Sequence, residues 1–257
     1  MLIVISPSKT QDFQEKAYSQ SSVPVLLEHS QQLVDVLRGQ SVDGLQQLMN
    51  ISPKLAALNV QRFNDFSQPF TVDNACPALQ AFKGDVYQGF PLAEYADTHL
   101  REYAQQHLRI LSGLYGVLRP WDLIQAYRLE MKTALANARG KNLYQFWGSR
   151  ITDTLNQSLD QQTDKVLVNL ASNEYFKAVK PKLLRGRLLT IQFKEEKAGK
   201  VRVIALFAKR ARGLMSHFIL SNRIESVDGL KVFCENGYRY EDTLSNDQQW
   251  TFVRPQP

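Results

Sequence analysis

The chain has 257 residues and a net charge of +6 at neutral pH, with 44% hydrophobic and 22% charged residues. This composition is typical of a soluble globular protein, and a chain of this length buries a substantial core without disulfides or structural metals. The two cysteines, Cys76 and Cys234, have no paired spacing, which favours a reducing compartment over a disulfide-stapled secreted fold. The modest excess of lysine and arginine favours polyanionic partners, because these side chains attract phosphates.

The N-terminus predicts a buried strand over residues 2–5, because a short apolar run stops there at Ser6 and Pro7 with no basic region before it. The run is too brief for a signal peptide, and a polar loop is expected from there to about Ser22. No apolar stretch of the sequence is long enough to cross a bilayer. We therefore expect a cytoplasmic protein with no membrane partner.

Helices and strands are mixed along the rest of the chain. Helices are expected over residues 25–37, 41–49, 97–108, 144–159 and 209–223 and from Ser52 onward, and strands over 166–170, 188–194, 201–207, 238–240 and 250–253. Because several strands are close enough in sequence for antiparallel hairpins, we expect an α/β fold with a mixed β-sheet core covered by helices. No linker divides the chain, so residues 1–257 are expected to form a single domain.

Residues 45–58, with the sequence LQQLMNISPKLAAL, resemble a helix-hairpin-helix motif within a module near residues 41–66. Ile51 is expected to plug the space between the helices, while the second helix presents N–H groups and Lys54 to a phosphate. Typical hairpins have glycine on both sides of the central apolar residue, whereas Asn50 and Ser52 stand there here. Asn tolerates left-handed backbone and Ser can cap, so the shape is expected to persist without the closest approach to DNA. The alternative is an ordinary helical hairpin packed on the domain.

A basic segment follows a predicted strand and opens a helix, with Lys209, Arg210 and Arg212 close together. Cations at a helix N-terminus oppose the helix dipole, so a bound phosphate would compensate them. The alternative is a solvated basic face, or ion pairs with Glu195 and Glu196.

An enzymatic alternative comes from Ser172, Asn173 and Glu174, which follow a buried strand. Glu174 would be the acid or base of an enzyme acting on a nucleotide or nucleic-acid base in a basic cleft. We favour the simpler interpretation that Ser172 caps a helix. The sequence leaves open whether the chain is an enzyme, and we assign no catalytic residue.

The segment from Ser6 to Lys9 fits the Ser-x-x-Lys pattern of penicillin-recognising enzymes, but the companion motifs of that site are absent from the sequence. We instead place Ser6, Ser8, Lys9 and Thr10 at the carboxyl end of the first strand, where open α/β sheets often bind anions.

The histidines indicate no metal site. His29, His99, His107 and His217 have no second His, Cys or carboxylate at a recognised ligand spacing. We expect no resident metal and no cofactor, so direct sequestration of iron is not favoured.

Seven segments, in order, resemble the YaaA family of bacterial peroxide-stress proteins. They are ISPSKT (5–10), AFKGDVY (81–87), LSGLYGVLRP (111–120), YRLEM (127–131), LYQFWG (143–148), NLASNEYFK (169–177) and AKRARG (208–213). Each segment is short, but the ordered set spans almost the whole chain, and the chain is identified as a member of that family.

The resemblance implies a response to hydrogen peroxide that limits free iron and so reduces Fenton damage to DNA. It also implies an α/β fold with a helix-hairpin-helix beside a positively charged cleft, and double-stranded DNA as the partner. By this resemblance Asn50, Ile51, Ser52 and Lys54 match the hairpin, and the cations Lys9, Lys83, Arg128, Lys209, Arg210 and Arg212 match the cleft. We expect a monomer.

Overall fold

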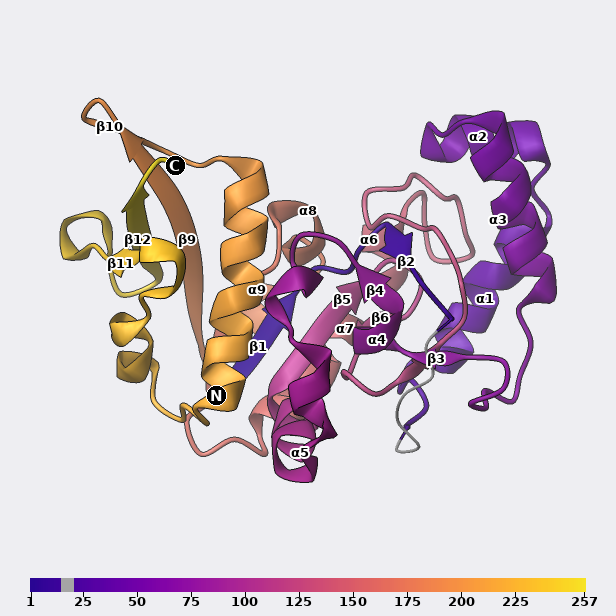
Figure 1. Cartoon of the computed structure of the whole chain (residues 1–257). Coiled ribbons are helices and arrows are strands. Elements are labelled where there is room, and N and C mark those ends of the chain that lie inside the picture. The colour runs from indigo at the N-terminus through magenta and orange to yellow at the C-terminus, as the bar shows by residue number, and fades with distance from the viewer. Residues whose placement is uncertain (15–20) are drawn as a thin grey trace.

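A central sheet organises the protein (Figure 1). The computed structural model describes residues 1–14 and 21–257, and in this part of the chain eight strands form that sheet. Their order is β11-β12-β9-β8-β1-β5-β6, with β10 paired to β9. The strands are β1 (Leu2–Ile5), β5 (Leu108–Ser112), β6 (Gly116–Leu118), β8 (Val166–Asn169), β9 (Arg187–Lys197), β10 (Lys200–Arg202), β11 (Arg239–Tyr240) and β12 (Gln249–Pro255).

Parallel pairing dominates the middle of the sheet. Strands β12, β9, β8, β1 and β5 run parallel to their neighbours, whereas β11, β10 and β6 pair antiparallel with β12, β9 and β5. The expected mixed α/β sheet flanked by helices is therefore confirmed. The hairpins anticipated from the sequence supply only its antiparallel additions.

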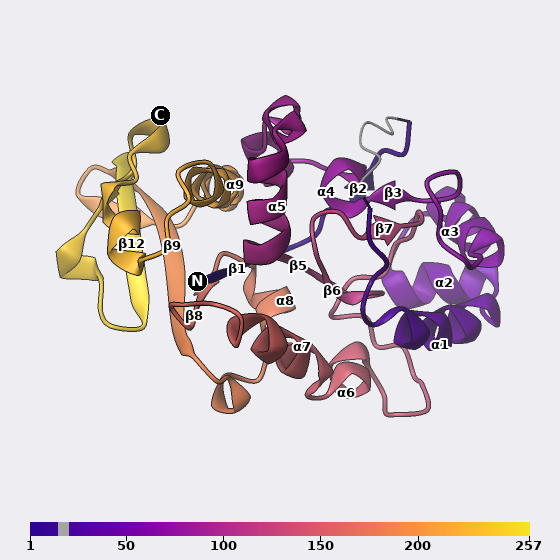
Figure 2. The same ribbon diagram turned by 90° about the horizontal axis from the view of Figure 1, so that it is seen from below.

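Strand β1 lies at the centre of the core, between β5 and β8, and all its residues are buried. Figure 2 shows the reason: α5 (Thr98–His107) and α9 (Ala205–Ser221) cover one face of the sheet, while α7 (Arg150–Leu159) covers the other. A strand covered on both faces excludes water from every side chain, which is why it reads as an uninterrupted apolar run.

A group of helices stands beside the sheet, beyond β6 (Figures 1 and 2). It comprises α1 (Leu27–Arg38), α2 (Val42–Met49) and α3 (Pro53–Asp65), close to the bounds expected from the sequence. Two small sheets, β2 (Thr10–Gln11) with β4 (Phe82–Lys83) and β3 (Cys76–Pro77) with β7 (Leu123–Ile124), lie between this group and the central sheet. The polar loop expected after β1 contains β2, and its residues 15–20 lie outside the described part.

Two expected elements differ in the structure. The single helix expected over residues 144–159 is two helices, α6 (Leu143–Trp147) and α7, because Gly148 ends α6 in a positive-φ conformation (φ 54°). The strand expected over residues 201–207 is wrong beyond Arg202, because α9 already begins at Ala205. The basic segment that starts at Lys209 therefore lies in the second turn of α9 and not at its opening.

The remaining elements are short. They are α4 (Ala78–Ala81), α8 (Asn173–Phe176) and the 3₁₀ turns η1 (Tyr87–Gly89), η2 (Leu92–Ala96), η3 (Pro181–Leu183), η4 (Val227–Val232), η5 (Glu235–Gly237) and η6 (Asp242–Leu244). Within the described ranges, no helix combines the length and apolar character needed to cross a membrane.

Candidate functional site

A pocket of about 640 Å³ opens at the carboxyl ends of β1 and β8. Its walls come from the loop after β1 (residues 6–10), the segment before η1 (84–87), the residues after β8 (172–175) and α9. Because neighbouring parallel strands end at the same edge, polar residues that follow them converge there, and open α/β sheets bind ligands in this position. The location expected for Ser6, Ser8, Lys9 and Thr10 is the one the pocket occupies.

A pair of serine hydroxyls joins the two strands at the pocket floor. Ser6 Oγ donates to Ser172 Oγ at 3.2 Å and accepts the backbone N–H of Ser172 at 2.8 Å. The phenol of Tyr87 donates to the carbonyl of Ser6 at 3.0 Å, which fixes the loop after β1. The hydroxyl proton of Ser172 has no acceptor within the described residues, so it is available to a ligand.

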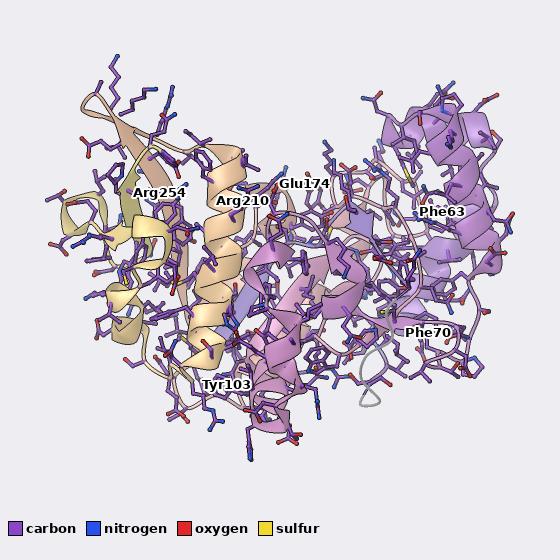
Figure 3. The ribbon with its side chains drawn as sticks, in the orientation of Figure 1. Phe63, Phe70, Tyr103, Glu174, Arg210 and Arg254 are labelled. Carbon is purple, nitrogen blue, oxygen red and sulfur yellow. The ribbon has the colours of Figure 1, made fainter. Side chains whose placement is uncertain are left out.

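The helix-capping role expected for Ser172 is wrong. Ser172 stands at the N-cap position of α8, but its side chain makes no capping hydrogen bond, and its hydroxyl instead accepts from Ser6 in the loop after β1. Glu174 is partly exposed and lines the pocket, where its Oε1 accepts the backbone N–H of Lys132 at 3.3 Å. Figure 3 shows Glu174 on α8 at the same edge of the molecule as Arg210 on α9.

Glu130 forms ion pairs with three cations beside the pocket. Its carboxylate lies 3.0 Å from Lys9 Nζ, 2.9 Å from Arg128 Nη2 and 3.8 Å from Lys132 Nζ, and its side chain is only 11% exposed. Lys9 and Arg128, both expected to face a phosphate, therefore have a carboxylate partner within the protein. Arg128, Glu130 and Lys132 alternate in charge at every second position, which was a usable sequence signal for this cluster.

The positive end of the α9 dipole is neutralised by a carboxylate of the protein itself. Glu195 on β9 is fully buried and accepts the N–H of Ile204 at 3.2 Å, at the positive end of the helix dipole. Glu195 also contacts the hydroxyl of Tyr238 and lies 3.6 Å from Nε of Arg254, which Figure 3 labels beside α9. The dipole argument for a bound phosphate at this helix end is therefore wrong, because Glu195 already supplies the negative charge.

The basic segment of α9 divides into exposed and enclosed cations. Lys209 and Arg210 are exposed, and Arg210 Nε lies 3.7 Å from Asp85 Oδ1. Arg212 is half-buried with an enclosed Nε: it lines the pocket with Lys209, and its Nε is buried without a hydrogen-bond partner in the described part of the chain. Burial lowers the pKa of the Arg212 guanidinium, because desolvation disfavours its charged form.

A glycine crossing encloses Arg212. Gly89 in η1 and Gly213 in α9 approach backbone to backbone, and an added Cβ at Gly213 would overlap the carbonyl oxygen of Val86. Only glycines permit this separation, because any Cβ would push η1 away from α9. The residue next to Gly213, Arg212, is thereby placed against the segment 84–87 that forms one wall of the pocket.

The turn between α2 and α3 keeps its shape without glycine. Asn50 is left-handed (φ 51°, ψ 59°), and Ser52 Oγ accepts the N–H of Leu55 at 3.3 Å as the N-cap of α3. Pro53 has no N–H and Ser52 occupies that of Leu55, whereas the N–H and the ammonium group of Lys54 bond to no described residue.

The remaining candidates, Ile51 and Lys83, lie outside the lining of the pocket. Ile51 is half-buried in the α2–α3 turn, whose residues, among those described, line no part of the pocket. Figure 1 shows α2 and the beginning of α9 at the same upper edge of the molecule. Lys83 lies on β4, opposite Thr10. Within residues 1–14 and 21–257, no group of three or more His, Cys, Asp or Glu side chains is placed to hold a metal ion.

Comparisons with known proteins identify the family. A family model described as "Peroxide stress protein YaaA" matches residues 1–244. The chain is 50% identical to a UPF0246 protein of Cellvibrio japonicus, with all of both chains covered. It is 52% identical to UPF0246 proteins of Alteromonas mediterranea and Acaryochloris marina, with at least 99% of each chain covered. The match from end to end shows that the chain belongs to the peroxide stress protein YaaA family.

Proposed function

We propose that the chain binds double-stranded DNA without sequence specificity during the peroxide stress response. The observation that carries this proposal is the set of exposed cations at one edge of the molecule. Lys54 and Lys209 are exposed and form no ion pair with any described residue, and Arg210 is 48% exposed with only a 3.7 Å contact to Asp85. They come from α3 and α9, which stand on opposite sides of the central strands, with α2 and the beginning of α9 both at the upper edge in Figure 1.

The α2–α3 turn supports a phosphate contact of modest strength. Lys54 offers one free N–H and one ammonium group at a helix N-terminus, where an anion is stabilised by the dipole and by direct hydrogen bonds. Side chains at Asn50 and Ser52 keep the backbone farther from DNA than glycines would. The turn is therefore proposed to position the protein on the phosphate backbone, without reading bases.

Protection of DNA from iron-dependent damage is the physiological role we propose for this binding, and it rests on family membership. A protein seated on the phosphates competes with the cations that collect there, so ferrous iron would be displaced from the place where hydroxyl radicals do harm. The proposal requires no iron site on the protein.

Binding to closed circular duplex DNA tests the proposal, since such DNA has no strand ends. The expected result is a log–log dependence of affinity on salt, with a slope of about −0.9 for each phosphate contact. The triple variant Lys54→Gln, Lys209→Gln, Arg210→Gln is expected to reduce that slope by about 2.7. The matched control is Lys165→Gln, another exposed lysine, at the amino end of β8. Absence of binding at low salt, or an unchanged slope in the triple variant, would refute duplex binding.

An enzyme acting on a nucleotide or nucleic-acid base is the second candidate, favoured by the exposure of Glu174 in the pocket. The carboxylate is held by one backbone N–H and is accessible to a ligand, as an acid or base must be. Turnover of nucleotides or DNA bases that is lost in Glu174→Gln, while duplex binding persists, would establish it. Equal turnover by wild type and variant would exclude Glu174 from this role.

A further inference from the structure

We propose that the pocket at the carboxyl ends of β1 and β8 binds a phosphate monoester, with Arg212 as its charge partner. The ligand class comprises a free mononucleotide or a phosphorylated DNA end. Phosphate binding in the pocket is separable from the duplex binding proposed above, because its main charge partner is Arg212, whereas Lys209 lines the pocket and also belongs to the exposed cations.

Arg212 differs from the other arginines that have a buried Nε. Three arginines in the described ranges have a buried Nε without a hydrogen bond: Arg128, Arg212 and Arg254. Arg128 pairs with Glu130 at 2.9 Å, and Arg254 lies 3.6 Å from Glu195 and stacks on the rings of Phe207 and Tyr238. Arg212 has neither a carboxylate nor an aromatic ring against it within those ranges.

A guanidinium whose Nε is buried without a hydrogen bond or a counter-charge is costly to the fold, because burial removes water from that nitrogen and no described group replaces it. The side of Arg212 that lines the pocket is where a counter-charge can enter. The close approach of Gly89 and Gly213 fixes the backbone next to Arg212 at the wall of the pocket.

The groups around Arg212 suit a phosphate. Lys209 adds a second cation to the lining without an ion pair of its own in the described residues, and the Ser172 hydroxyl has a proton to donate. A terminal phosphate carries up to two charges and three strong acceptor oxygens, which match such a set of donors. Glu174 on the same wall can accept a hydrogen bond from a sugar hydroxyl or a base N–H of the attached group.

The size of the pocket excludes a duplex. A volume of about 640 Å³ lies within the range of roughly 300–1,000 Å³ that holds a small molecule or one nucleotide. A phosphate at a strand end can enter with its own nucleotide, whereas a phosphate inside a duplex brings both neighbouring nucleotides and the opposite strand. The monoester is thus the form that fits both the charge and the space.

Isothermal titration with inorganic phosphate, a nucleoside 5′-monophosphate and the same nucleoside tests the proposal. Phosphate and the nucleotide are expected to bind, and the nucleoside is not. Arg212→Gln should weaken nucleotide binding about 10- to 100-fold, as expected for the loss of a charged hydrogen-bonding partner. Arg239→Gln is the matched control, because Arg239 is an exposed arginine on the edge strand β11 and forms no ion pair with a described residue.

Thermal unfolding separates a binding role from a structural one. Arg212→Gln is expected to unfold at the same or a higher temperature than the wild type without ligand, and to lose the rise in Tm that the nucleotide gives the wild type. Should Arg212→Gln fail to fold, Ser172→Ala provides the test, with nucleotide binding expected to weaken about 3- to 10-fold. Neither phosphate nor nucleotide binding at millimolar concentration, or equal binding by these variants and the wild type, would overturn the proposal.

Oligonucleotides with a 5′-phosphate or a 5′-hydroxyl distinguish the two sources of the monoester. Tighter, Arg212-dependent binding of the phosphorylated oligonucleotide assigns the pocket to DNA ends. No preference between them, with Arg212-dependent binding of the mononucleotide, assigns it to a free small molecule. Arg212→Gln should leave binding to closed circular duplex DNA within about twofold, because the exposed cations that meet internal phosphates are unchanged. Failure of duplex binding and failure of the pocket are therefore separate results.

Discussion

The α2–α3 turn and the pocket at the end of β1 and β8 hold their cations in opposite ways. Lys54 at the turn is exposed, whereas Arg212 in the pocket is enclosed without a carboxylate in the described part of the chain. An exposed cation keeps its water, so it costs the fold little and gives weak, salt-sensitive contacts. An enclosed cation lowers the free energy of unfolding of the ligand-free protein, and binding of an anion offsets that loss. The two regions are thus suited to different anions, a continuous polyanion and a single terminal phosphate.

The largest effect on stability is expected from Gly213→Ala, which disturbs the close backbone contact beside Arg212. The new Cβ overlaps the carbonyl oxygen of Val86, and overpacking against backbone costs about 3 kcal/mol or more. The gain in helix propensity on replacing Gly by Ala, about 1 kcal/mol, is smaller, so we expect a net loss of about 2 kcal/mol in the free energy of unfolding. Urea denaturation measures it, and nucleotide binding should fall with it.

Gly39→Ala is the control for that change, because Gly39 has φ −75° and an added Cβ there would lie 3.5 Å from its nearest neighbour, the carbonyl oxygen of Val36. It should alter stability by less than about 0.5 kcal/mol. If Gly213→Ala is equally mild, the close crossing does not constrain Arg212.

Glu130→Gln tests whether the cations beside the pocket are held by the protein itself. It removes the carboxylate shared by Lys9 and Arg128, and the loss should come mainly from Arg128, whose side chain is 19% exposed against 58% for Lys9. We expect the free energy of unfolding to fall by about 2 kcal/mol, less than for a fully buried pair because water reaches Lys9.

Asp35→Asn provides the exposed comparison for Glu130→Gln. Asp35 lies 3.5 Å from Arg38 on the surface of α1, with its side chain 59% exposed, so its loss should cost no more than about 0.5 kcal/mol. If both variants lost the same free energy of unfolding, Glu130 would be solvated like a surface residue. Its ion pairs with Lys9 and Arg128 would then contribute no more than an exposed pair.

The smallest effect is expected from a matched pair of capping serines. Ser41 accepts the N–H of Gly44 at the start of α2, and Ser52 accepts that of Leu55 at the start of α3. Ser41→Ala and Ser52→Ala should each cost about 1 kcal/mol in the free energy of unfolding. If the turn contacts phosphate, fluorescence anisotropy with duplex DNA should show weaker binding for Ser52→Ala alone. Equal binding by the two variants would argue against a contact at the turn.

Local sequence patterns predicted the α2–α3 turn well, because everything that shapes it lies within a few residues. Ser52 caps, Pro53 starts the helix, and Asn50 takes the left-handed conformation that its short polar side chain tolerates. The pocket was predicted only in outline. Its position followed from strand ends, but the partners of its side chains come from distant segments, as with Ser6 and Ser172.

The errors have the same origin. Lys209, Arg210 and Arg212 were expected at a helix opening, yet α9 begins at Ala205 and Glu195 on β9 already neutralises that helix end. The capping role expected for Ser172 is wrong, because its hydroxyl bonds to Ser6 in the loop after β1 and makes no hydrogen bond to its own helix. At the start of α9 and at the N-cap of α8, a contact with a residue distant in sequence takes the place of the local contact that the sequence suggests.

The sequence by itself determined the family, the mixed α/β class and the helices beside the sheet, since these depend on ordered motifs, apolar runs and caps that are local to the chain. The tertiary structure alone decided which cations are neutralised and which are free. Glu130 takes Lys9 and Arg128, while the close approach of Gly89 and Gly213 encloses Arg212 without a carboxylate in the described residues. The physical reason is that the state of a charge depends on the water and counter-charges around it, and folding sets both by bringing distant residues together.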